Sequence, residues 1–273
     1  MFIEVPNIAP ITNSISLALH TGGLKGRKPL SMLVCAPPDS GKTRAMEQFH
    51  DGRAILRINF ATRSGLIQLL DEDQRWKIVH HIILSDYTAS MAGNNVVGEG
   101  LRDLLLPLLY DGVTGYHTHL IRKLHLPPGA TILVGMIAGI VPSLLKRRTV
   151  DWSEGGLLRR FLPLSYKYTP KQIEGIKLLS LAGRNIKPPA IRLNREVWGQ
   201  QISVDERKTR SLLTLVTGGP TATEHWHNMI LAHALRRGST VAEDQDIAAI
   251  IRLSEYWNFD MHELNSQILE LPD

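Results

Sequence analysis

Short apolar runs alternate with segments of helical periodicity over residues 1–169 of the chain. Five apolar runs predict strands, at 30–36, 54–60, 78–86, 130–139 and 162–168. Five segments with helical spacing predict helices around them, at 11–20, 44–49, 63–70, 101–110 and 140–148. Alternation of strand and helix is typical of a parallel sheet with helices on both faces. We therefore expect an α/β fold, a three-layer domain built on a parallel five-stranded sheet.

Only helical patterns follow residue 169. Thr169 is a typical N-cap and Pro170 a typical first residue of a helix. Prolines at 188–189 and a Gly-Gly-Pro turn at 218–220 separate four segments, 171–183, 205–216, 223–237 and 242–257. These patterns predict an α/β domain over 1–169, with 1–29 as its lead-in, and an all-helical domain over 170–273. Three tryptophans, Trp198, Trp226 and Trp257, are expected in the core of the second domain.

The stretch after the first predicted strand carries the most specific chemical signal. It follows the pattern G-x-x-x-x-G-K-[ST] except at its first position, and it consists of Ala36, Pro37, Pro38, Asp39, Ser40, Gly41, Lys42 and Thr43, with Arg44 opening the next helix. In a phosphate-binding loop the backbone N–H groups cradle phosphates, the lysine reaches the outer phosphates and the Ser/Thr hydroxyl ligates Mg²⁺. The sequence therefore predicts an ATP·Mg²⁺ site, and the alternative is a Gly-Lys-Thr turn met by chance.

A carboxylate ends the third predicted strand. Asp86 follows the apolar run 78–85, and ligands of open α/β sheets bind outside the carboxyl ends of the strands. We therefore expect Asp86 to approach the Mg²⁺ ion held by Thr43. The neighbouring His80 and His81 are expected to be packed residues of the strand.

Composition limits the class of protein. The chain has 273 residues, 43% of them hydrophobic, and its single cysteine, Cys35, excludes disulfides and cysteine-based metal sites. No secretory signal is visible in residues 1–6, and we expect a cytoplasmic protein. The uncharged segment 124–145 is interrupted by proline and glycine, which favours a buried strand with its loops over a membrane span.

Charge is unevenly distributed along the chain. The net charge is +5, but residues 240–273 contain eight acidic residues and one arginine, a net charge of −7, which leaves +12 for residues 1–239. A basic body suits a nucleic-acid backbone, although a solvated surface is the default explanation. The candidates for DNA contact are Arg63, Arg122, Lys123, Lys146, Arg147 and Arg148.

The segment 115–125 predicts a hairpin with a wet, basic face. Strand alternation places His117, His119 and His125 on one side of it. Three histidines invite a zinc hypothesis, but neither a cysteine nor a carboxylate lies near them in the sequence. Contact with solvent or nucleic acid is the preferred interpretation.

The order of these motifs resembles that of AAA+ ATPases, and most closely the group with a hairpin before the fourth strand, which includes the minichromosome-maintenance helicases. Residues 156–161, Gly-Leu-Leu-Arg-Arg-Phe, are similar to that group's G-x-x-S-R-F motif. The resemblance covers about residues 25–258 and implies that Arg160 reaches the nucleotide of a neighbouring subunit. It also implies that the helical domain is the AAA+ lid.

Several positions depart from this family pattern. Tyr87 follows Asp86 where family members usually carry a catalytic glutamate, and Ala138 and Gly139 stand where a polar sensor is expected. Thr221 stands near the position of a lid arginine. These departures predict slow ATP hydrolysis, unless Glu47, Glu99 or a residue of a neighbour activates water.

The resemblance implies an ATP-binding protein that assembles with itself into a hexameric ring or a helical filament. Lys42 and Arg160 would be its catalytic residues, and Thr43 and Asp86 its metal ligands. We expect it to act on DNA, in replication, transposition or the maintenance of a mobile element. The alternative is a nucleotide-dependent switch or scaffold that recruits a protein partner and does not contact DNA.

Overall fold

The computed structural model describes residues 8–50, 53–92, 95–114, 126–181, 190–213, 216 and 219–257. Its centre is a five-stranded sheet in the order β2-β3-β6-β1-β7, with every pair parallel. The strands are β1 (Ser31–Cys35), β2 (Ile55–Ile58), β3 (His81–Leu84), β6 (Gly135–Ile140) and β7 (Phe161–Ser165). Each of the five predicted runs contributes one strand to this sheet, and each of these strands is shorter than its apolar run.

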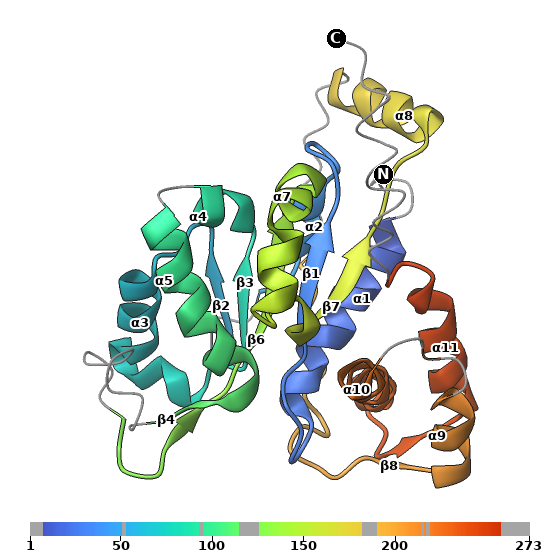
Figure 1. Ribbon diagram of the computed structural model, residues 1–273. Coiled ribbons are helices and arrows are strands. Elements are labelled where there is room, and N and C mark those ends of the chain that lie inside the picture. The colour runs from blue at the N-terminus through green and yellow to red at the C-terminus, as the bar shows by residue number, and fades with distance from the viewer. Residues whose placement is uncertain are drawn as a thin grey trace.

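Figure 1 labels the helices, which fall into two groups along the chain, before and after β7. Those before β7 are α1 (Ile8–His20), α2 (Lys42–Glu47), α3 (Arg63–Asp71), α4 (Tyr87–Ala92), α5 (Asn95–Leu106) and α7 (Pro142–Glu154). Those after β7 are α8 (Pro170–Leu181), α9 (Glu206–Leu213), α10 (Pro220–Arg236) and α11 (Asp244–Ser254). Two short pairs complete the described part, β4 (Val113–Thr114) with β5 (Thr131–Ile132) and β8 (Ser203–Val204) with β9 (Val241–Ala242).

The two faces of the sheet bury different helices. Along β1, Met32 and Val34 belong to a core that includes α1, α2, α10 and α11, whereas Leu33 and Cys35 belong to a core that includes α3, α5 and α7. Successive side chains of a strand point to opposite faces, so β1 contributes to both cores. The three-layer α/β arrangement is thereby confirmed.

The segment between β3 and β6 differs from its prediction in three places. Residues 87–92 and 95–106 are helical, whereas the sequence predicted a helix only from residue 101. At Pro107 the helix continues as one turn of π-helix to Asp111, because proline cannot donate the α-helical hydrogen bond. The predicted strand 130–139 is divided, since Thr131–Ile132 pairs antiparallel with Val113–Thr114 and only β6 joins the sheet.

The C-terminal helices share a core with the first helix. Met229, Leu231 and Leu235 of α10 are buried in the same cluster as Ile11 and Ile15 of α1. Figure 1 shows α10 beside α1, while α8 projects beyond the end of the sheet. Burial of apolar surface between α1 and α10 therefore anchors the C-terminal helices to the α/β layer.

The predicted start of α8 is confirmed. The hydroxyl of Thr169 accepts a hydrogen bond from the backbone N–H of Gln172 (3.3 Å), and the amide oxygen of Gln172 accepts one from the backbone N–H of Thr169 (2.8 Å). This reciprocal pair satisfies two backbone donors at the helix start.

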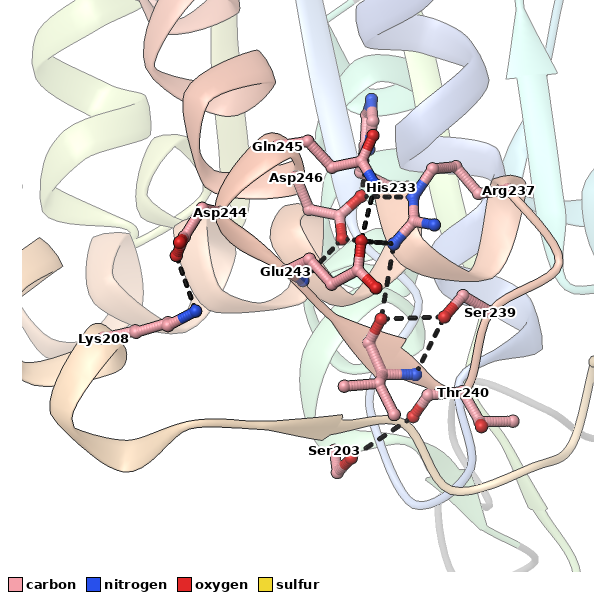
Figure 2. A network of polar contacts seen from close by, with 11 residues as sticks. Ser203, Lys208, His233, Arg237, Ser239, Thr240, Glu243, Asp244, Gln245 and Asp246 are labelled. Carbon is pink, nitrogen blue, oxygen red and sulfur yellow. Dashed lines mark hydrogen bonds and ion pairs between the residues drawn. The ribbon is translucent and has the colours of Figure 1, made fainter.

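A polar network joins α10 to α11 (Figure 2). The fully buried Asp246 carboxylate accepts hydrogen bonds from Arg237 Nε (2.9 Å) and Nη2 (2.8 Å), and from the backbone N–H of Glu243 (2.7 Å). His233 Nδ1 lies 2.5 Å from the same carboxylate. On the far side of α11, Asp244 pairs with Lys208 of α9. Asp244 and Asp246, two of the acidic residues near the C-terminal end, are thus paired with basic side chains of the helical part.

The three tryptophans have different neighbours. Trp226 and Trp257 pack edge to face with ring centroids 5.6 Å apart, as expected for core residues of the helical part. Trp198 instead lies against Gly23 and edge-on to His80.

No helix in the described ranges is long and apolar enough to cross a membrane.

Candidate phosphate-binding site

The neighbouring strands β1 and β6 are followed by helices that cover opposite faces of the sheet. The helix after β1 packs on one face through Ala45 and Met46, and the helix after β6 packs on the other through Leu144 and Trp152. Ligands of open α/β sheets bind in the crevice that such a change of face creates. The predicted phosphate-binding loop, residues 36–43, lies at this crevice.

Two backbone features shape the loop. It begins where the backbone N–H of Ala36 donates to the carbonyl of Ile140 at the end of β6 (3.2 Å). Asp39 and Gly41 have positive φ angles of 57° and 78°. A side chain is disfavoured at such angles, most strongly when it is β-branched, so Gly41 suits the turn from the loop into α2.

The lysine of the motif folds back over the loop. Lys42 Nζ donates to the carbonyls of Ala36 (2.6 Å) and Pro37 (2.7 Å), so the ammonium lies inside the turn. Burial lowers the pKa of Lys42, while the charges of Asp86 and Asp39 act in the opposite direction. A positive charge held among backbone groups at this crevice suits an anionic ligand.

The carboxylate after β3 lies at the same edge of the sheet. Asp86 is exposed, and its Oδ1 accepts a hydrogen bond from the backbone N–H of Ala89 (2.9 Å). Its charge acts on Lys42 across the crevice. Thr43 is also exposed, at the first turn of α2. The structure therefore places Lys42 and Asp86 close enough for their charges to interact. Thr43 is the next residue after Lys42.

Two tyrosines after β7 lie beside the loop, and sequence reasoning missed both. The phenol of Tyr166 donates to the carbonyl of Ser40 (3.0 Å), and the ring of Tyr168 packs edge-on to Tyr166 with centroids 5.7 Å apart. Burial raises the pKa of both phenols, so both hydroxyls keep their protons at neutral pH. Their spacing of two residues after a strand that neighbours β1 was the available signal.

The position after Asp86 does not face the crevice. Tyr87 is fully buried, and its ring packs against Trp152 at a centroid distance of 5.6 Å. The expectation that residue 87 occupies the place of a water-activating glutamate is therefore wrong for its side chain. A carboxylate introduced there would be buried in the core and would not reach a bound nucleotide.

The end of β6 also lacks a polar side chain. A Cβ atom at Gly139 would lie 2.4 Å from the carbonyl oxygen of Ser85, so the backbones leave no room for one. The neighbouring Ala138 is fully buried. Thr88 lies close to this edge, and its hydroxyl accepts a hydrogen bond from the backbone N–H of Val141 (3.2 Å).

The two glutamates considered as substitutes are both exposed. Glu47 lies at the end of α2, and its carboxylate is 3.9 Å from the guanidinium of Arg57. Glu99 lies on α5. Neither has a contact with Asp86 or with the loop among the interactions of the described residues.

The arginine predicted to act across a subunit interface is held within its own chain. Arg160 is only 9% exposed, and it donates to the carbonyl of Gly156 (2.6 Å) and to the carboxylate of Asp111 (3.2 Å). Its guanidinium also lies over the ring of Tyr110, 5.6 Å from the centroid. The adjacent Arg159 is exposed.

The candidate DNA contacts are dispersed. Lys146 and Arg147 are exposed on α7, whereas Arg148 pairs with Asp151 of the same helix (3.6 Å). Arg63 is half-buried at the start of α3, and Figure 1 places α3 and α7 on different sides of α5. Arg122, Lys123 and the three hairpin histidines lie outside the described residues.

Within the described ranges, no three His, Cys, Asp or Glu side chains lie together so that they could hold a metal ion. A Mg²⁺ ion at this site would therefore depend on nucleotide oxygens and water beside Thr43 and Asp86, as is usual for Mg²⁺.

Comparison with protein-family models found no matching family, and comparison with curated proteins found no significant match.

Proposed function

We propose that the chain binds ATP with Mg²⁺ at the carboxyl ends of β1 and β6. The observation that carries this proposal is the position of Lys42, whose ammonium lies inside the loop with the charge of Asp86 acting on it. Lys42 would exchange its bonds to the loop carbonyls for bonds to the β- and γ-phosphates. Thr43 and Asp86 would hold the Mg²⁺ ion, and the backbone of residues 36–44 would surround the phosphates.

The AAA+ resemblance extends this proposal to the whole chain. The α/β layer would be a P-loop domain, and α8 to α11 would correspond to the lid. The buried contact between α1 and α10 supports a lid that is anchored on one side. Slow hydrolysis is part of the proposal, because Tyr87 is in the core and Gly139 has no room for a sensor side chain.

Self-assembly into a hexameric ring or a helical filament follows from the arginine motif. An arginine of this kind acts on the nucleotide of a neighbour, where it stabilises the charge of the transferred phosphoryl group. Arg160 would have to exchange its bonds to Gly156 and Asp111 for that contact. The exposed Arg159 lies beside it in the same motif.

DNA is the proposed target of the assembled protein, in replication, transposition or the maintenance of a mobile element. The charge of +12 on residues 1–239 supports this, and Lys146 and Arg147 are exposed candidates for backbone contact. The second candidate function is a nucleotide-dependent switch that recruits a protein. The core position of Tyr87 favours the switch, because a slow ATPase suits a binding signal better than a motor.

Calorimetric titration with ATP tests the nucleotide site. The parent should bind ATP in the presence of Mg²⁺, Lys42→Ala should lose binding, and the matched variant Lys77→Ala, at an exposed lysine outside the site, should bind as the parent does. Asp86→Asn should abolish the difference between Mg²⁺ and a chelator. A parent that does not bind ATP, or a Lys42→Ala variant that binds normally, would show that the proposal is wrong.

A salt titration separates the two candidate functions. A protein that contacts DNA phosphates loses affinity steeply as salt rises, because condensed counterions are released. Lys146→Ala combined with Arg147→Ala should flatten the salt slope by about one to two units. Absence of DNA binding both with and without ATP would favour the switch.

A further inference from the structure

The hydroxyl of Tyr168 is buried without a hydrogen-bond partner among the described residues. The side chain is 7% exposed, and burial raises the pKa of its phenol, so the hydroxyl remains a donor at neutral pH. Leaving a buried donor unpaired costs free energy, because the group loses its hydrogen bonds to water and gains none in the protein. An unpaired group of this kind in a native structure calls for an explanation, which a missing ligand would supply.

This hydroxyl lies close to the candidate loop. A Cβ atom placed on Gly41 would lie 3.8 Å from the hydroxyl oxygen of Tyr168 and 3.9 Å from Cδ1 of Ile8, with no other atom within 4 Å apart from those of Gly41 and its chain neighbours. The space over Gly41 is therefore bounded by one polar group and one apolar group. Gly41 is also the motif glycine that leads directly into Lys42.

The position of the Tyr168 ring is fixed by its neighbour. Tyr166 packs edge-on against it, and the hydroxyl of Tyr166 is already committed to the carbonyl of Ser40. Tyr166 thus bonds to the loop through Ser40, while the hydroxyl of Tyr168 remains unpaired beside it.

A second unpaired phenol in the chain provides a comparison. Tyr87 is fully buried, and its hydroxyl also has no partner among the described residues. It packs against Trp152 in the other core, on the opposite face of the sheet from Tyr168. Tyr87 therefore offers a matched control in which the same group is buried away from the loop.

We propose that Tyr168 is a nucleotide-binding residue whose hydroxyl donates a hydrogen bond to an acceptor oxygen of the bound nucleotide, beside Gly41. This inference rests on the proposed ATP site and adds to it a contact outside the loop motif. The acceptor is an oxygen of the phosphate chain or of the sugar. Ile8 would contribute apolar contact on the same side.

Calorimetric titration of Tyr168→Phe with ATP and Mg²⁺ tests the inference. The variant keeps the ring and removes only the hydroxyl, so its fold should be retained. If the acceptor is a charged phosphate oxygen, the dissociation constant for ATP should rise about tenfold or more, and if it is a neutral sugar oxygen it should rise about twofold or more. Tyr87→Phe should leave it unchanged. Thermal unfolding without nucleotide should show Tyr168→Phe at least as stable as the parent.

Titration with inorganic tripolyphosphate distinguishes the two acceptors. Weaker binding of both tripolyphosphate and ATP would place the bond on the phosphate chain, and weaker binding of ATP alone would place it on the sugar. Equal affinity of the parent and Tyr168→Phe for ATP would overturn this inference alone. A parent that binds no ATP would remove the proposed function together with it.

Discussion

The phenol of Tyr166 donates a hydrogen bond to the carbonyl oxygen of Ser40 over 3.0 Å, and so ties the chain after β7 to the loop after β1. The two residues are far apart in sequence and follow the neighbouring parallel strands β7 and β1. The loop conformation therefore depends on the fifth strand of the sheet as well as on its own residues.

Replacement of Tyr166 by phenylalanine should loosen the loop. The variant loses one buried hydrogen bond, for which we expect a loss of about 1 kcal/mol in the free energy of unfolding. ATP affinity should fall in parallel, because the loop would no longer be held in one conformation. Urea unfolding and calorimetric titration measure the two effects, and unchanged values in both would contradict the support we assign to this bond.

Replacement of Arg160 by alanine should lower both stability and ATP-driven assembly. The side chain bonds to Gly156 and Asp111, so its loss should cost about 2 kcal/mol in urea unfolding. Asp111→Asn weakens the same pair and keeps the arginine, so it should reduce stability and preserve assembly. Arg159→Ala removes an exposed side chain and should leave stability unchanged. Light scattering in the presence of ATP measures assembly. An Arg160→Ala variant that assembles like the parent would exclude a role for Arg160 at the nucleotide of a neighbouring subunit.

Acid should destabilise the fold through two buried histidines. Burial lowers the pKa of His81 to about 3 and of His20 to about 4, whereas both protonate near 6.5 in the unfolded chain. The unfolded state therefore binds more protons below pH 6.5, and stability falls as the pH drops from 6.5 toward these lower values. At pH 5 the loss should be about 2 kcal/mol for each histidine.

Urea midpoints at pH 8 and pH 5 measure this effect. His81→Gln should reduce the difference between the two midpoints, and His50→Gln, at an exposed histidine, should not. Equal stability of the parent at both pH values would refute the assignment.

Breaking the network around Asp246 should separate α10 from α11. Arg237→Ala leaves a fully buried carboxylate without its bidentate partner, which should cost about 3 kcal/mol. Arg252→Ala removes an exposed arginine of α11 and serves as the matched control. Chemical denaturation compares them, and equal midpoints would mean that His233 and the backbone of Glu243 hold Asp246 unaided.

Two glycine-to-alanine substitutions should have opposite signs. At Gly139 the added Cβ would lie 2.4 Å from the carbonyl oxygen of Ser85, so strands must shift and stability should fall by about 2 kcal/mol or more. At Gly175 on α8 nothing lies within 4 Å, and alanine should stabilise by about 0.5–1 kcal/mol. Thermal unfolding of the pair provides the check, and a neutral Gly139→Ala would show that β6 can move away from Ser85.

Local patterns in the sequence predicted the features that local physics controls. The five strands followed from apolar runs, and the start of α8 followed from Thr169 and Pro170. The ends of β1 and β3, after which Lys42 and Asp86 follow in the chain, were predicted for the same reason. The helix predicted over 101–110 is present, but helical structure over 87–92 and 95–100 was missed because Gly and Asn disfavour a helix locally. Burial of Leu101, Leu104 and Leu105 of the same helix outweighs that preference.

Long-range partners were beyond the reach of the sequence. Nothing near Arg160 in the chain indicates Asp111, and nothing near Tyr87 indicates the ring of Trp152. The bond from Tyr166 to Ser40 likewise depends on β7 lying next to β1. Roles taken from a motif therefore needed the fold before their side chains could be placed.

The reactivity of the buried Cys35 thiol can report how often the sheet opens at β1. It is the only cysteine of the chain, it ends the strand that leads into the loop, and burial raises its pKa to about 12. Thiol reagents attack the thiolate of an accessible cysteine, so the native protein should be almost inert to them. The rate of labelling then measures how often β1 separates from its neighbours, and a ligand seated on the loop should slow it in proportion to occupancy.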